Sequence, residues 1–534
     1  MIKDWNVKID GRDMNEYEII EALMESRGIK NQNKFMNPTE DDMIPFEEMH
    51  GIDDGCQVVL ETIENDGKFI VHFDVDVDGC SAGSIMTRYL LNYTNNVTTI
   101  INDGKRHGVE DFDLSMLDNN TTLIVVDSLN NDPCVYKKIL DTGARLIVLD
   151  HHIIEDNLLD ADMPFCLISS ANNYPNPALS GAGVVFKFCK YIDSVTWNDY
   201  ADEYWDLATA GIIADMCDVS EQSAENRYIC SMGFRNQNNF AISKINGSFG
   251  FDAKAVSFGV APLINAANRM NENKTAMNLF LSDDEKEVAS LIRTLKKCKE
   301  KQNDLVAQQM DDLIQQGDAQ LDKKCMYFFI DADAEIAGLM GNRLLEKYQR
   351  PLFILRKVDN IYAGSMRAVG VENFAKIVND TGIGKCLGHE LAAGAFIPVD
   401  RFDEFQNKIE DELSNVEFKQ SISIDIQLNV DQITDNLIRL IKDVNKISGA
   451  GFPPITVMIG EVSDYEVGDM SKGKHLKITT PNVTFIKWNF SDWDEMWGIE
   501  DKEFCGVGQL DCGFFGKTYY RQLILNDFKF EDIW

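Results

Sequence analysis

The chain has 534 residues and a formal net charge of −36 at pH 7, and its length corresponds to about three or four domains of roughly 150 residues each. It contains no run of about 18 apolar residues and its first residues show no secretory pattern, so we expect a cytoplasmic protein without a membrane span. The acidic balance argues against broad electrostatic adhesion to nucleic acid, but it allows an enzyme that holds phosphates through metal ions and local cations. The twelve cysteines form no CxxC pair, which favours reduced thiols over disulfides or zinc sites.

The first half of the chain is predicted to hold an extension and a parallel α/β domain. Residues 1–50 are polar, with one helical pattern over 15–26, and we interpret them as an N-terminal extension. Over residues 51–283 strand patterns alternate with helical ones, which is typical of βαβ units and a mainly parallel sheet. The expected strands lie near 69–74, 97–101, 122–127, 146–150 and 165–169, with helices near 81–93 and 134–142 and a helical part from 181 to 283.

The second half is predicted to contain three further segments. Residues 284–318 carry spaced apolar positions without proline, which predicts one long connector helix. Residues 319–415 alternate again between strand and helix patterns, and β patterns dominate residues 416–534. The predicted fold class is α/β: a parallel-sheet domain, joined by the long helix to a smaller α/β domain, and then an OB-like β-barrel.

Carboxylates follow several of the predicted strands. Asp74, Asp76 and Asp78 come directly after the apolar run 69–73. Further apolar runs end at Asp127, at Asp150 with His151 and His152, and at Asp215. Because the carboxyl ends of parallel strands meet at one edge of a sheet, where ligands usually bind, we expect these groups to converge. Such clustered carboxylates and imidazoles suit two Mn²⁺ or Mg²⁺ ions, although each run alone is equally typical of a solvated acidic turn.

A basic and aromatic patch stands out in the acidic C-terminal segment. It consists of Lys472, Lys474, His475, Lys477, Phe485, Lys487 and Trp488. OB barrels bind single-stranded nucleic acid through surfaces of this kind. An ordinary β-barrel with solvated lysines explains the same residues equally well.

The order of these motifs resembles the DHH phosphoesterase superfamily, and within it the RecJ single-stranded-DNA-specific exonucleases. The superfamily resemblance rests on Asp-Val-Asp-Val-Asp-Gly at 74–79, the lone Asp127, Asp-His-His at 150–152 and Ala-Asp at 214–215. The narrower resemblance rests on Ser-Gly-Ala-Gly-Val at 180–184, Glu-Asn-Arg at 225–227, Ala-Pro-Leu-Ile-Asn-Ala-Ala-Asn-Arg at 261–269, Gly-Ser-Met-Arg at 364–367, Gly-His-Glu-Leu-Ala-Ala-Gly at 388–394 and Lys-His-Leu-Lys at 474–477. The sequence departs from the family at Leu387 and Asn268, where the family has glycine.

The resemblance implies a site and a division into domains. The segments become a DHH domain (51–283), a connector helix (284–318), a DHHA1 domain (319–415) and an OB-like domain (416–534). The implied ligands of two Mn²⁺ or Mg²⁺ ions are Asp74, Asp76, Asp78, Asp127, His151 and Asp215, with His72 as a further ligand, and Asp127 is best placed to bridge the ions. Asp150 is expected to orient His151, and His152 and His389 are expected to contact the scissile phosphate. Arg269, Ser365 and Arg367 match a pocket for a terminal 5′-phosphate, and Gly388, Arg106, His107, Lys474 and Lys477 are expected to make further substrate contacts.

The function implied is 5′-to-3′ hydrolysis of single-stranded DNA to mononucleotides, in DNA repair, recombination or replication. Two alternatives stay open: a DHH phosphodiesterase of short oligoribonucleotides or cyclic dinucleotides, and a non-catalytic DHH scaffold. The expected partners are single-stranded DNA and a single-stranded-DNA-binding protein or helicase. We expect a monomer, in a bacterial cytoplasm or in a host cytoplasm if the gene is from a phage.

Overall fold

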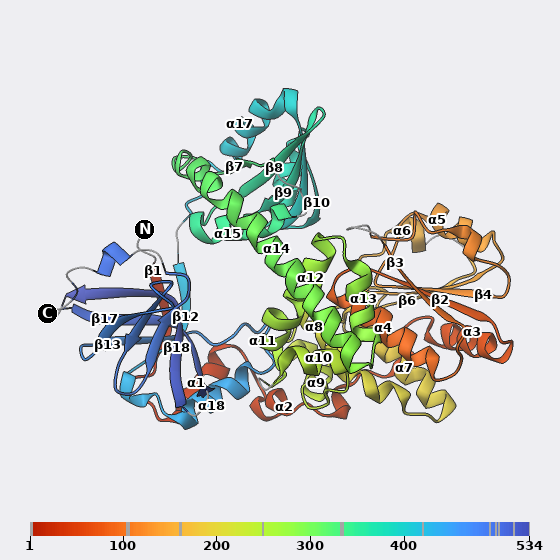
Figure 1. Ribbon diagram of the computed structural model, residues 1–534, viewed down its shortest axis with the longest axis horizontal. Helices are drawn as coiled ribbons and strands as arrows, with labels where there is room; N and C mark the ends of the chain where they lie inside the picture. The colour runs from red at the N-terminus through yellow and green to blue at the C-terminus, as the bar shows by residue number, and fades with distance from the viewer. Residues whose placement is uncertain are drawn as a thin grey trace. The chain divides into compact units, whose positions relative to one another are not determined.

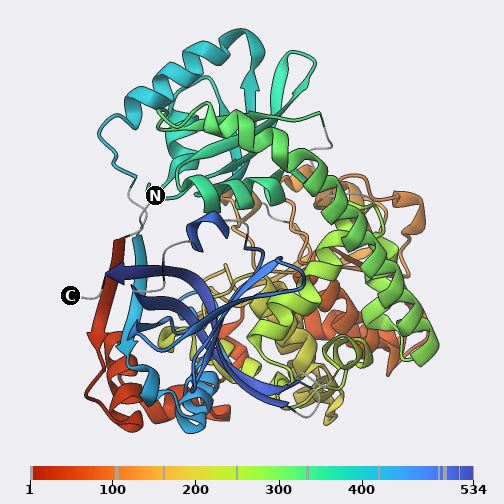
Figure 2. The same cartoon turned by 60° about the vertical axis from the view of Figure 1, so that its left-hand side comes forward.

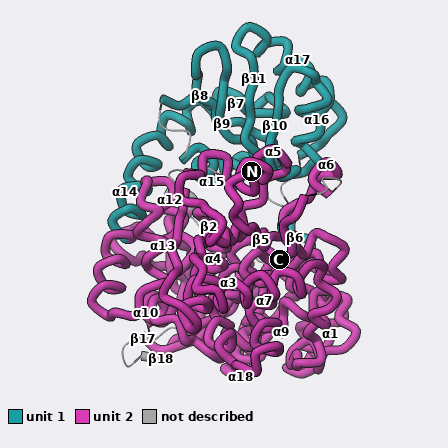
Figure 3. The backbone as a smooth tube through the Cα atoms, turned by 90° about the vertical axis from the view of Figure 1, so that its right-hand side faces the viewer, with its two compact units in different colours: residues 1–6, 296–422 teal, residues 7–295, 423–534 magenta. Residues whose placement is uncertain are grey.

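The computed structural model describes residues 4–102, 107–159, 163–247, 250–331, 336–418, 421–490, 493–496, 499, 502–515 and 518–532. The chain divides into two compact units, which Figure 3 draws in two colours. The smaller unit contains residues 1–6 and 296–422, and the larger contains residues 7–295 and 423–534. Each is described by itself below. No helix in the described part of the chain has the length and apolar character that crossing a membrane requires.

A five-stranded parallel sheet forms the first part of the larger unit, in the order β3-β2-β4-β5-β6 (Figure 1). Its strands are β2 (Lys68–Phe73), β3 (Val97–Ile101), β4 (Thr121–Val126), β5 (Arg145–Asp150) and β6 (Cys166–Ser169), and every neighbouring pair is parallel. All five agree with the strands predicted from apolar runs. Since both faces of this sheet are covered, the strands are apolar throughout rather than alternating.

Helices cover both faces of this sheet. Phe69, Val71 and Phe73 of β2 share one core with α3 (Ile52–Glu64), α4 (Val77–Leu91) and α7 (Gly181–Thr196). Ile70 points to the other face, where a smaller core includes α5 (Pro133–Leu140) and Leu158 of α6 (Asp156–Leu159). The helical part that follows packs around α4 and consists of α8 (Trp205–Ala214), α9 (Ala224–Gly233), α10 (Phe240–Asn246), α11 (Ala253–Ala255), α12 (Ala261–Arg269) and α13 (Asn273–Leu281).

A single helix of 34 residues, α14 (Glu285–Asp318), occupies the predicted connector. The smaller unit then forms a sheet in the order β10-β11-β9-β8-β7. Its strands are β7 (Met326–Phe329), β8 (Leu352–Val358), β9 (Ile361–Arg367), β10 (Lys385–His389) and β11 (Ala392–Pro398), with helices α15 (Ala337–Tyr348), α16 (Phe374–Asp380) and α17 (Phe402–Glu412). Only β7 and β8 pair in parallel, and the glycine-flanked His389 ends the first strand of a tight β10–β11 hairpin.

An eight-stranded mixed sheet completes the larger unit, in the order β1-β12-β13-β17-β18-β16-β15-β14. Its strands are β1 (Asp4–Asp10), β12 (Ser421–Leu428), β13 (Val457–Val462), β14 (Glu466–Met470), β15 (His475–Thr479), β16 (Thr484–Lys487), β17 (Lys502–Phe515) and β18 (Thr518–Asp532), and α18 (Asp435–Asn445) follows β12. This confirms a β-rich C-terminal segment. An OB domain is a small five-stranded barrel, whereas this eight-stranded sheet has β1 and β14 at its two ends, so the comparison with an OB domain stays a prediction.

The first fifty residues are built into this sheet. Figure 2 shows β1, in red, beside the pale blue β12, and α1 (Glu16–Ser26) packs against α18. Arg27 forms two hydrogen bonds with the buried carboxylate of Asp425, at 2.9 and 2.7 Å. The segment predicted as an extension therefore supplies an edge strand. The other predicted domain boundaries stay predictions.

Candidate metal centre

The predicted ligands gather at the carboxyl edge of the parallel sheet. Asp74 follows β2, Asp127 follows β4, and Asp150 is the last residue of β5. Asp76 is the N-cap of α4, and its carboxylate accepts a hydrogen bond from the Gly79 amide at 3.0 Å. The strands are parallel and in register, so their ends deliver Asp74, Asp127 and Asp150 to one edge, as the sequence predicts. The prediction of a fourth strand end at Asp215 is wrong, because this residue is the C-cap of helix α8.

His151 lies at the middle of the cluster. Its Nε2 is 3.2 Å from Asp127 Oδ1, 3.7 Å from Asp78 Oδ2 and 3.7 Å from Asp215 Oδ2. Two overlapping groups have ligand atoms within 4.8 Å of one another, namely Asp78, His151 and Asp215, and Asp127, His151 and His152. His151 belongs to both groups, and its Nε2, with a single lone pair, can bind one ion, so a second ion would depend on the carboxylates.

Backbone amides and glycines position two of the buried carboxylates, Asp78 and Asp127. Asp78 accepts hydrogen bonds from the Gly181 and Ala182 amides at the start of α7, at 2.7 and 2.9 Å. A Cβ on Gly181 would lie 2.6 Å from Asp127 Oδ1, and a Cβ on Gly211 would lie 2.2 Å from Asp78 Oδ1. These two glycines leave the space that the carboxylates occupy. Their role was missed in the sequence, although Gly181 belongs to the quoted Ser-Gly-Ala-Gly-Val motif.

The electrostatics of the cluster favour a bound cation. Burial, followed by repulsion from Asp74 and Asp78, raises the pKa of Asp76 to about 7. Burial and the neighbouring Asp78 hold the pKa of Asp127 well above its usual range and also raise the pKa of Asp215. Asp127 Oδ1 is moreover buried without a hydrogen-bond donor. Because a divalent ion would offset this repulsion and use that free oxygen, the donor set fits Mn²⁺ or Mg²⁺.

Asp150 holds His152 rather than the ring of His151. The Asp150 carboxylate lies 2.7 Å from His152 Nδ1 and accepts backbone N–H groups from Leu129, His151 and His152, each at 2.7 Å. Burial is the largest single influence and would raise its pKa, but the hydrogen bonds from His152 and the charges of His152 and His151 together outweigh burial and lower the pKa of Asp150 to about 2. In turn, burial would lower the pKa of His152, and the Asp150 carboxylate raises it to about 9. Orientation of His151 by Asp150, which the resemblance implies, stays a prediction, and the structure adds a direct contact of Asp150 with the His152 ring.

The remaining candidates near this edge lie outside the two ligand groups. His72 is buried in β2, where its Nε2 is 3.1 Å from Asn102 Oδ1, and its Nδ1 has no hydrogen-bond partner. His107 Nδ1 lies 3.1 Å from Asp74 Oδ2, and its ring packs against the His152 ring with 4.8 Å between the centroids. Arg106 lies outside the described residues.

The residues that the resemblance matches to a phosphate pocket are divided between the two units. Arg269 is the last residue of α12 in the larger unit, and its Nη1 donates to the Asn265 carbonyl at 3.2 Å. In the smaller unit, β9 brings Ser365 and Arg367 together, with Arg367 Nη1 2.7 Å from Ser365 Oγ. Asn342 of α15 accepts from Arg367 Nε at 2.7 Å, and it is a second residue that the sequence analysis did not single out. His389 and Gly388 lie in β10 of the same unit.

The C-terminal basic patch is arranged around β15. Lys474 is exposed, and Lys477 alternates with the buried Leu476 and Ile478. The His475 ring packs edge-on against Trp488, with 4.8 Å between the ring centroids, and Trp488 is 45% exposed. The structure thus places an aromatic and a basic side chain on one solvent-facing surface of this sheet.

Comparison with known proteins agrees with this architecture. Residues 68–212 match the DHH family, N-terminal domain, and residues 322–415 match the DHHA1 domain. The chain is 27% identical over 454 residues to the SPbeta prophage protein YorK of Bacillus subtilis, whose assignment as a single-strand DNA-specific exonuclease is itself provisional; the match covers 76% of this chain and 78% of YorK. It is 23% identical over 492 residues to the single-stranded-DNA-specific exonuclease RecJ of the same organism, covering 87% of this chain and 61% of RecJ.

Solved structures give the same fold. The Mn²⁺ complex of RecJ from Thermus thermophilus superimposes with a TM-score of 0.78 at 20% identity, covering 98% of this chain and 79% of that one. Its Mg²⁺ complex gives a TM-score of 0.72 at 20% identity, covering 98% and 78%. The predicted fold class and the predicted resemblance to the RecJ type of DHH protein are confirmed.

Proposed function

We propose that this chain, a DHH–DHHA1 protein of the RecJ type, is a metal-dependent exonuclease that degrades single-stranded DNA from its 5′ end to mononucleotides. The observation that carries the proposal is the convergence of ligand atoms within 4.8 Å of one another in two overlapping groups, Asp78 with His151 and Asp215, and Asp127 with His151 and His152. A chain that served only as a scaffold would have no need of buried, mutually repelling carboxylates, which cost stability unless a cation binds.

The ions would be held by Asp76, Asp78, Asp127, His151 and Asp215, with Asp74 at the edge of the set. Two divalent ions in such a site supply an activated water nucleophile and offset the charge of the phosphate and the leaving oxygen. The chain itself contributes the fixed geometry. Backbone amides hold Asp78, and the left-handed backbone of Asp127, with φ of 51°, aims its carboxylate at His151.

His152 is proposed to hold the proton that the leaving oxygen needs. Its Nδ1 is bonded to Asp150, which leaves Nε2 for the substrate. With its pKa raised to about 9 by Asp150, the ring is protonated at neutral pH and can donate a hydrogen bond to a phosphate oxygen. His389, on β10 of the smaller unit, is proposed to contact the same phosphate.

Polarity is proposed to come from recognition of a terminal 5′-phosphate. The Arg367 guanidinium is held by Ser365 and Asn342, and a planar guanidinium can bind a phosphate with two parallel hydrogen bonds. Arg269 is proposed to join it, and Lys474 and Lys477 to contact the strand. The cysteines of this chain are all free, which supports a reducing cytoplasm as its setting.

The test is digestion of end-labelled oligonucleotides with Mn²⁺. The substrates are 5′-phosphorylated single-stranded DNA, the same strand with a 5′-hydroxyl, a blunt duplex and single-stranded RNA. Wild type is compared with Asp127→Asn, which keeps the shape of the side chain, and with Asp54→Asn, which makes the same change at an exposed position. We expect mononucleotides from the 5′ end of single-stranded DNA, and a loss of at least about a hundredfold in Asp127→Asn alone.

The outcomes separate the alternatives. Cleavage confined to short RNA would assign the chain to the oligoribonucleotide branch of DHH phosphodiesterases. Retained binding without cleavage of any substrate would support the scaffold. A strong preference for the 5′-phosphorylated strand would support the roles proposed for Arg269, Ser365 and Arg367.

A further inference from the structure

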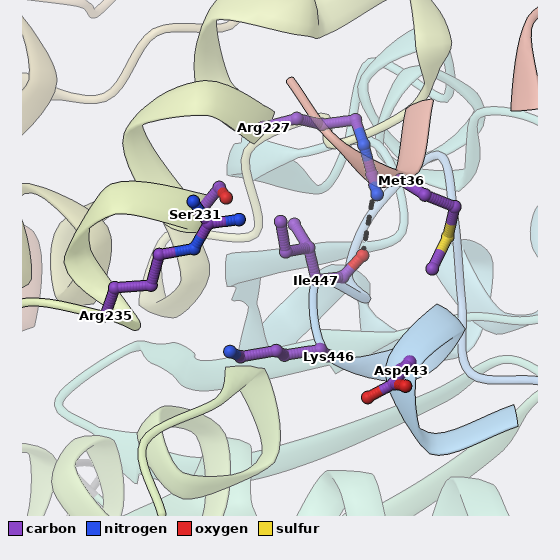
Figure 4. A pocket seen from close by; sticks show the side chains of 7 residues that line it. All are labelled: Met36, Arg227, Ser231, Arg235, Asp443, Lys446 and Ile447. Carbon is purple, nitrogen blue, oxygen red and sulfur yellow. Dashed lines mark hydrogen bonds between the residues drawn. The ribbon is translucent and has the colours of Figure 1, made fainter. Parts of the chain in front are cut away.

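A small pocket lies in the larger unit, away from every predicted metal ligand. Seven residues line it: Met36, Arg227, Ser231, Arg235, Asp443, Lys446 and Ile447 (Figure 4). They come from α2 (Gln32–Met36), from α9 and the residues after it, and from the end of α18 and the residues after it. The volume of the pocket is about 50 Å³. Since one water needs about 10–15 Å³ on this measure, the pocket holds roughly three to five waters. A tetrahedral group of five heavy atoms fits such a space.

The charge of this pocket is unusual for an acidic chain. Three cationic side chains line it, Arg227, Arg235 and Lys446, against the single carboxylate of Asp443, whereas the whole chain carries −36. Neither Arg235 nor Lys446 makes an ion pair with any residue that the structure describes. Both follow the C-terminal ends of helices, where cations are favoured by the helix dipole. That position accounts for their presence but does not neutralise their charge.

Arg227 supplies the strongest sign of a ligand. Arg227 is only 3% exposed, yet its guanidinium has no carboxylate partner among the described residues. Nε donates to the Phe35 carbonyl at 3.1 Å, and Nη1 donates to the carbonyls of Val219 and Ile447 at 2.8 and 3.1 Å. These bonds leave the Nη2 group, with two N–H donors, without a described acceptor. Burial lowers the pKa of Arg227 to about 10, as expected for a buried cation without a counter-ion.

The spacing along α9 places further donors beside Arg227. Ser231 follows it at an interval of four residues within α9, and side chains at this spacing share one face of a helix. Arg235 is an exposed residue in the turn that follows the end of α9. Ser231 is 6% exposed, and its hydroxyl makes no hydrogen bond to a described residue. Figure 4 shows Arg235 extending along this face toward Ser231, with Lys446 on the opposite side of the pocket. The pocket therefore presents guanidinium, hydroxyl and ammonium donors to one small volume.

From these observations we propose that this pocket is a second anion site, which binds a phosphate group through Arg227, Ser231, Arg235 and Lys446. Buried guanidinium groups with free N–H donors match phosphate oxygens in geometry and charge. The phosphate can belong to a DNA strand, or to a small molecule such as inorganic phosphate or a mononucleotide. The site does not depend on the proposed nuclease activity.

The first experiment measures the melting temperature of metal-free protein against the concentration of inorganic phosphate, with chloride at equal ionic strength as reference. Metal is removed with chelator so that no ion at the other site recruits phosphate. A ligand that binds only the folded state stabilises it, so we expect a saturable rise in Tm on the order of 2 °C or more in the wild type. Arg235→Ala/Lys446→Ala removes both partly exposed cations and should lose most of this rise.

The matched control is Lys137→Ala/Lys138→Ala, which removes two exposed cations from α5 and changes the net charge equally. It should keep the wild-type response. Ser231→Ala removes the hydroxyl without changing charge, and should reduce the apparent affinity for phosphate. An equal rise in Tm for wild type and Arg235→Ala/Lys446→Ala, or no saturable rise in the wild type, would overturn the proposal.

A second experiment identifies the source of the phosphate. Binding of fluorescent oligo(dT) to the same metal-free variants is followed by anisotropy over a range of salt concentrations. If a strand phosphate occupies the site, Arg235→Ala/Lys446→Ala weakens oligonucleotide binding about tenfold. The slope of the logarithm of the binding constant against the logarithm of the salt concentration then falls in magnitude by about one. If oligonucleotide binding is unchanged while the Tm response to phosphate is lost, the ligand is a small phosphate compound.

Discussion

At the scale of single residues, the centre depends on glycines and on one hydrogen bond as much as on its ligands. Gly181 and Gly211 leave room for two carboxylates. Of the two adjacent histidine rings, Asp150 contacts that of His152, through Nδ1, and raises the pKa of this ring. The other ring, His151, is thereby free to face Asp78, Asp127 and Asp215. Two neighbouring imidazoles thus receive different roles from one buried carboxylate.

Gly211→Ala is expected to impair metal binding. Alanine is the better helix former by about 1 kcal/mol, so the backbone of α8 tolerates it, but its Cβ would lie 2.2 Å from Asp78 Oδ1 and displace that carboxylate. Titration with Mn²⁺, followed by electron paramagnetic resonance of the free ion, should show at least about tenfold weaker binding. Gly259→Ala, where the nearest atom to the new Cβ is 3.7 Å away, is the control. Wild-type Mn²⁺ affinity in Gly211→Ala would contradict the packing argument.

Asp206 is expected to make stability depend on pH. It is fully buried at the start of α8, where its carboxylate accepts the Leu207 and Asn239 amides, and burial raises its pKa from 3.8 to about 6. A carboxyl whose folded pKa is raised contributes stability that is present below about pH 4 and is lost as the pH rises through 6. The shift corresponds to roughly 3 kcal/mol.

The measurement is the free energy of unfolding from pH 4.5 to 7.5 for wild type, Asp206→Asn and the exposed control Asp54→Asn. The difference between Asp206→Asn and wild type should move in favour of the variant as the pH rises, while the difference for Asp54→Asn stays nearly flat. A constant difference for Asp206→Asn would show that this carboxyl titrates normally.

At the scale of elements, the motifs divide into those that form a site and those that join elements. Glu225 and Asn226 of α9, from the Glu-Asn-Arg motif, belong to the second kind. Glu225 is buried with Lys187 of α7 at 2.8 Å, and it also accepts from Tyr174 and Asn176. Asn226 donates to the carbonyls of Ala178 and Asp218. A buried network of this kind ties α9 to α7 and to the loop before α7, which positions Gly181 beside the metal centre.

The β10–β11 hairpin carries His389, and the backbone conformation of this hairpin depends on Gly388. Gly388 has φ of 127°, and an added Cβ would lie 3.2 Å from Ala393 Cα. Gly388→Ala should therefore distort the hairpin at a cost of about 1–3 kcal/mol and lower the rate of DNA cleavage about tenfold. Mn²⁺ affinity should not change, since the predicted ligands lie in the other unit. Gly394→Ala on β11, where the nearest atom to the new Cβ is 3.7 Å away, is the control, and equal rates in both variants would argue against a role for the hairpin.

At the scale of the whole molecule, the two ends of the chain share one sheet. β1 pairs with β12, and Arg27 is bonded to Asp425 across 398 residues of sequence. The carboxylate of Asp425 is almost completely buried and also accepts the Thr456 amide. The N-terminal fifty residues are thus a structural part of the C-terminal sheet.

Arg27→Ala is expected to destabilise the larger unit by about 1.5–3 kcal/mol, because it removes two charge-assisted hydrogen bonds from the buried Asp425 carboxylate and leaves only the more exposed Lys8, 3.4 Å away. Urea denaturation followed by circular dichroism measures this loss. Arg12→Ala, which breaks exposed ion pairs in the same segment, should have a much smaller effect. In the double variant Arg27→Ala/Asp425→Ala the loss should be less than the sum of the two single losses, and additivity would contradict a direct pairing.

The sequence by itself determined the parallel sheet and the edge at which the metal ligands meet. Apolar runs that end in carboxylates specify buried strands locally, and parallel pairing then brings their ends together, so the five strands and the edge at which Asp74, Asp127 and Asp150 gather could be predicted from local patterns. Only the tertiary structure decided what depends on contacts between distant segments. The pairing of β1 with β12, the choice of His152 by Asp150, and the cationic pocket around Arg227 each join residues from separate elements. No local periodicity encodes such contacts, because they are fixed by how buried polar groups find partners once the elements pack.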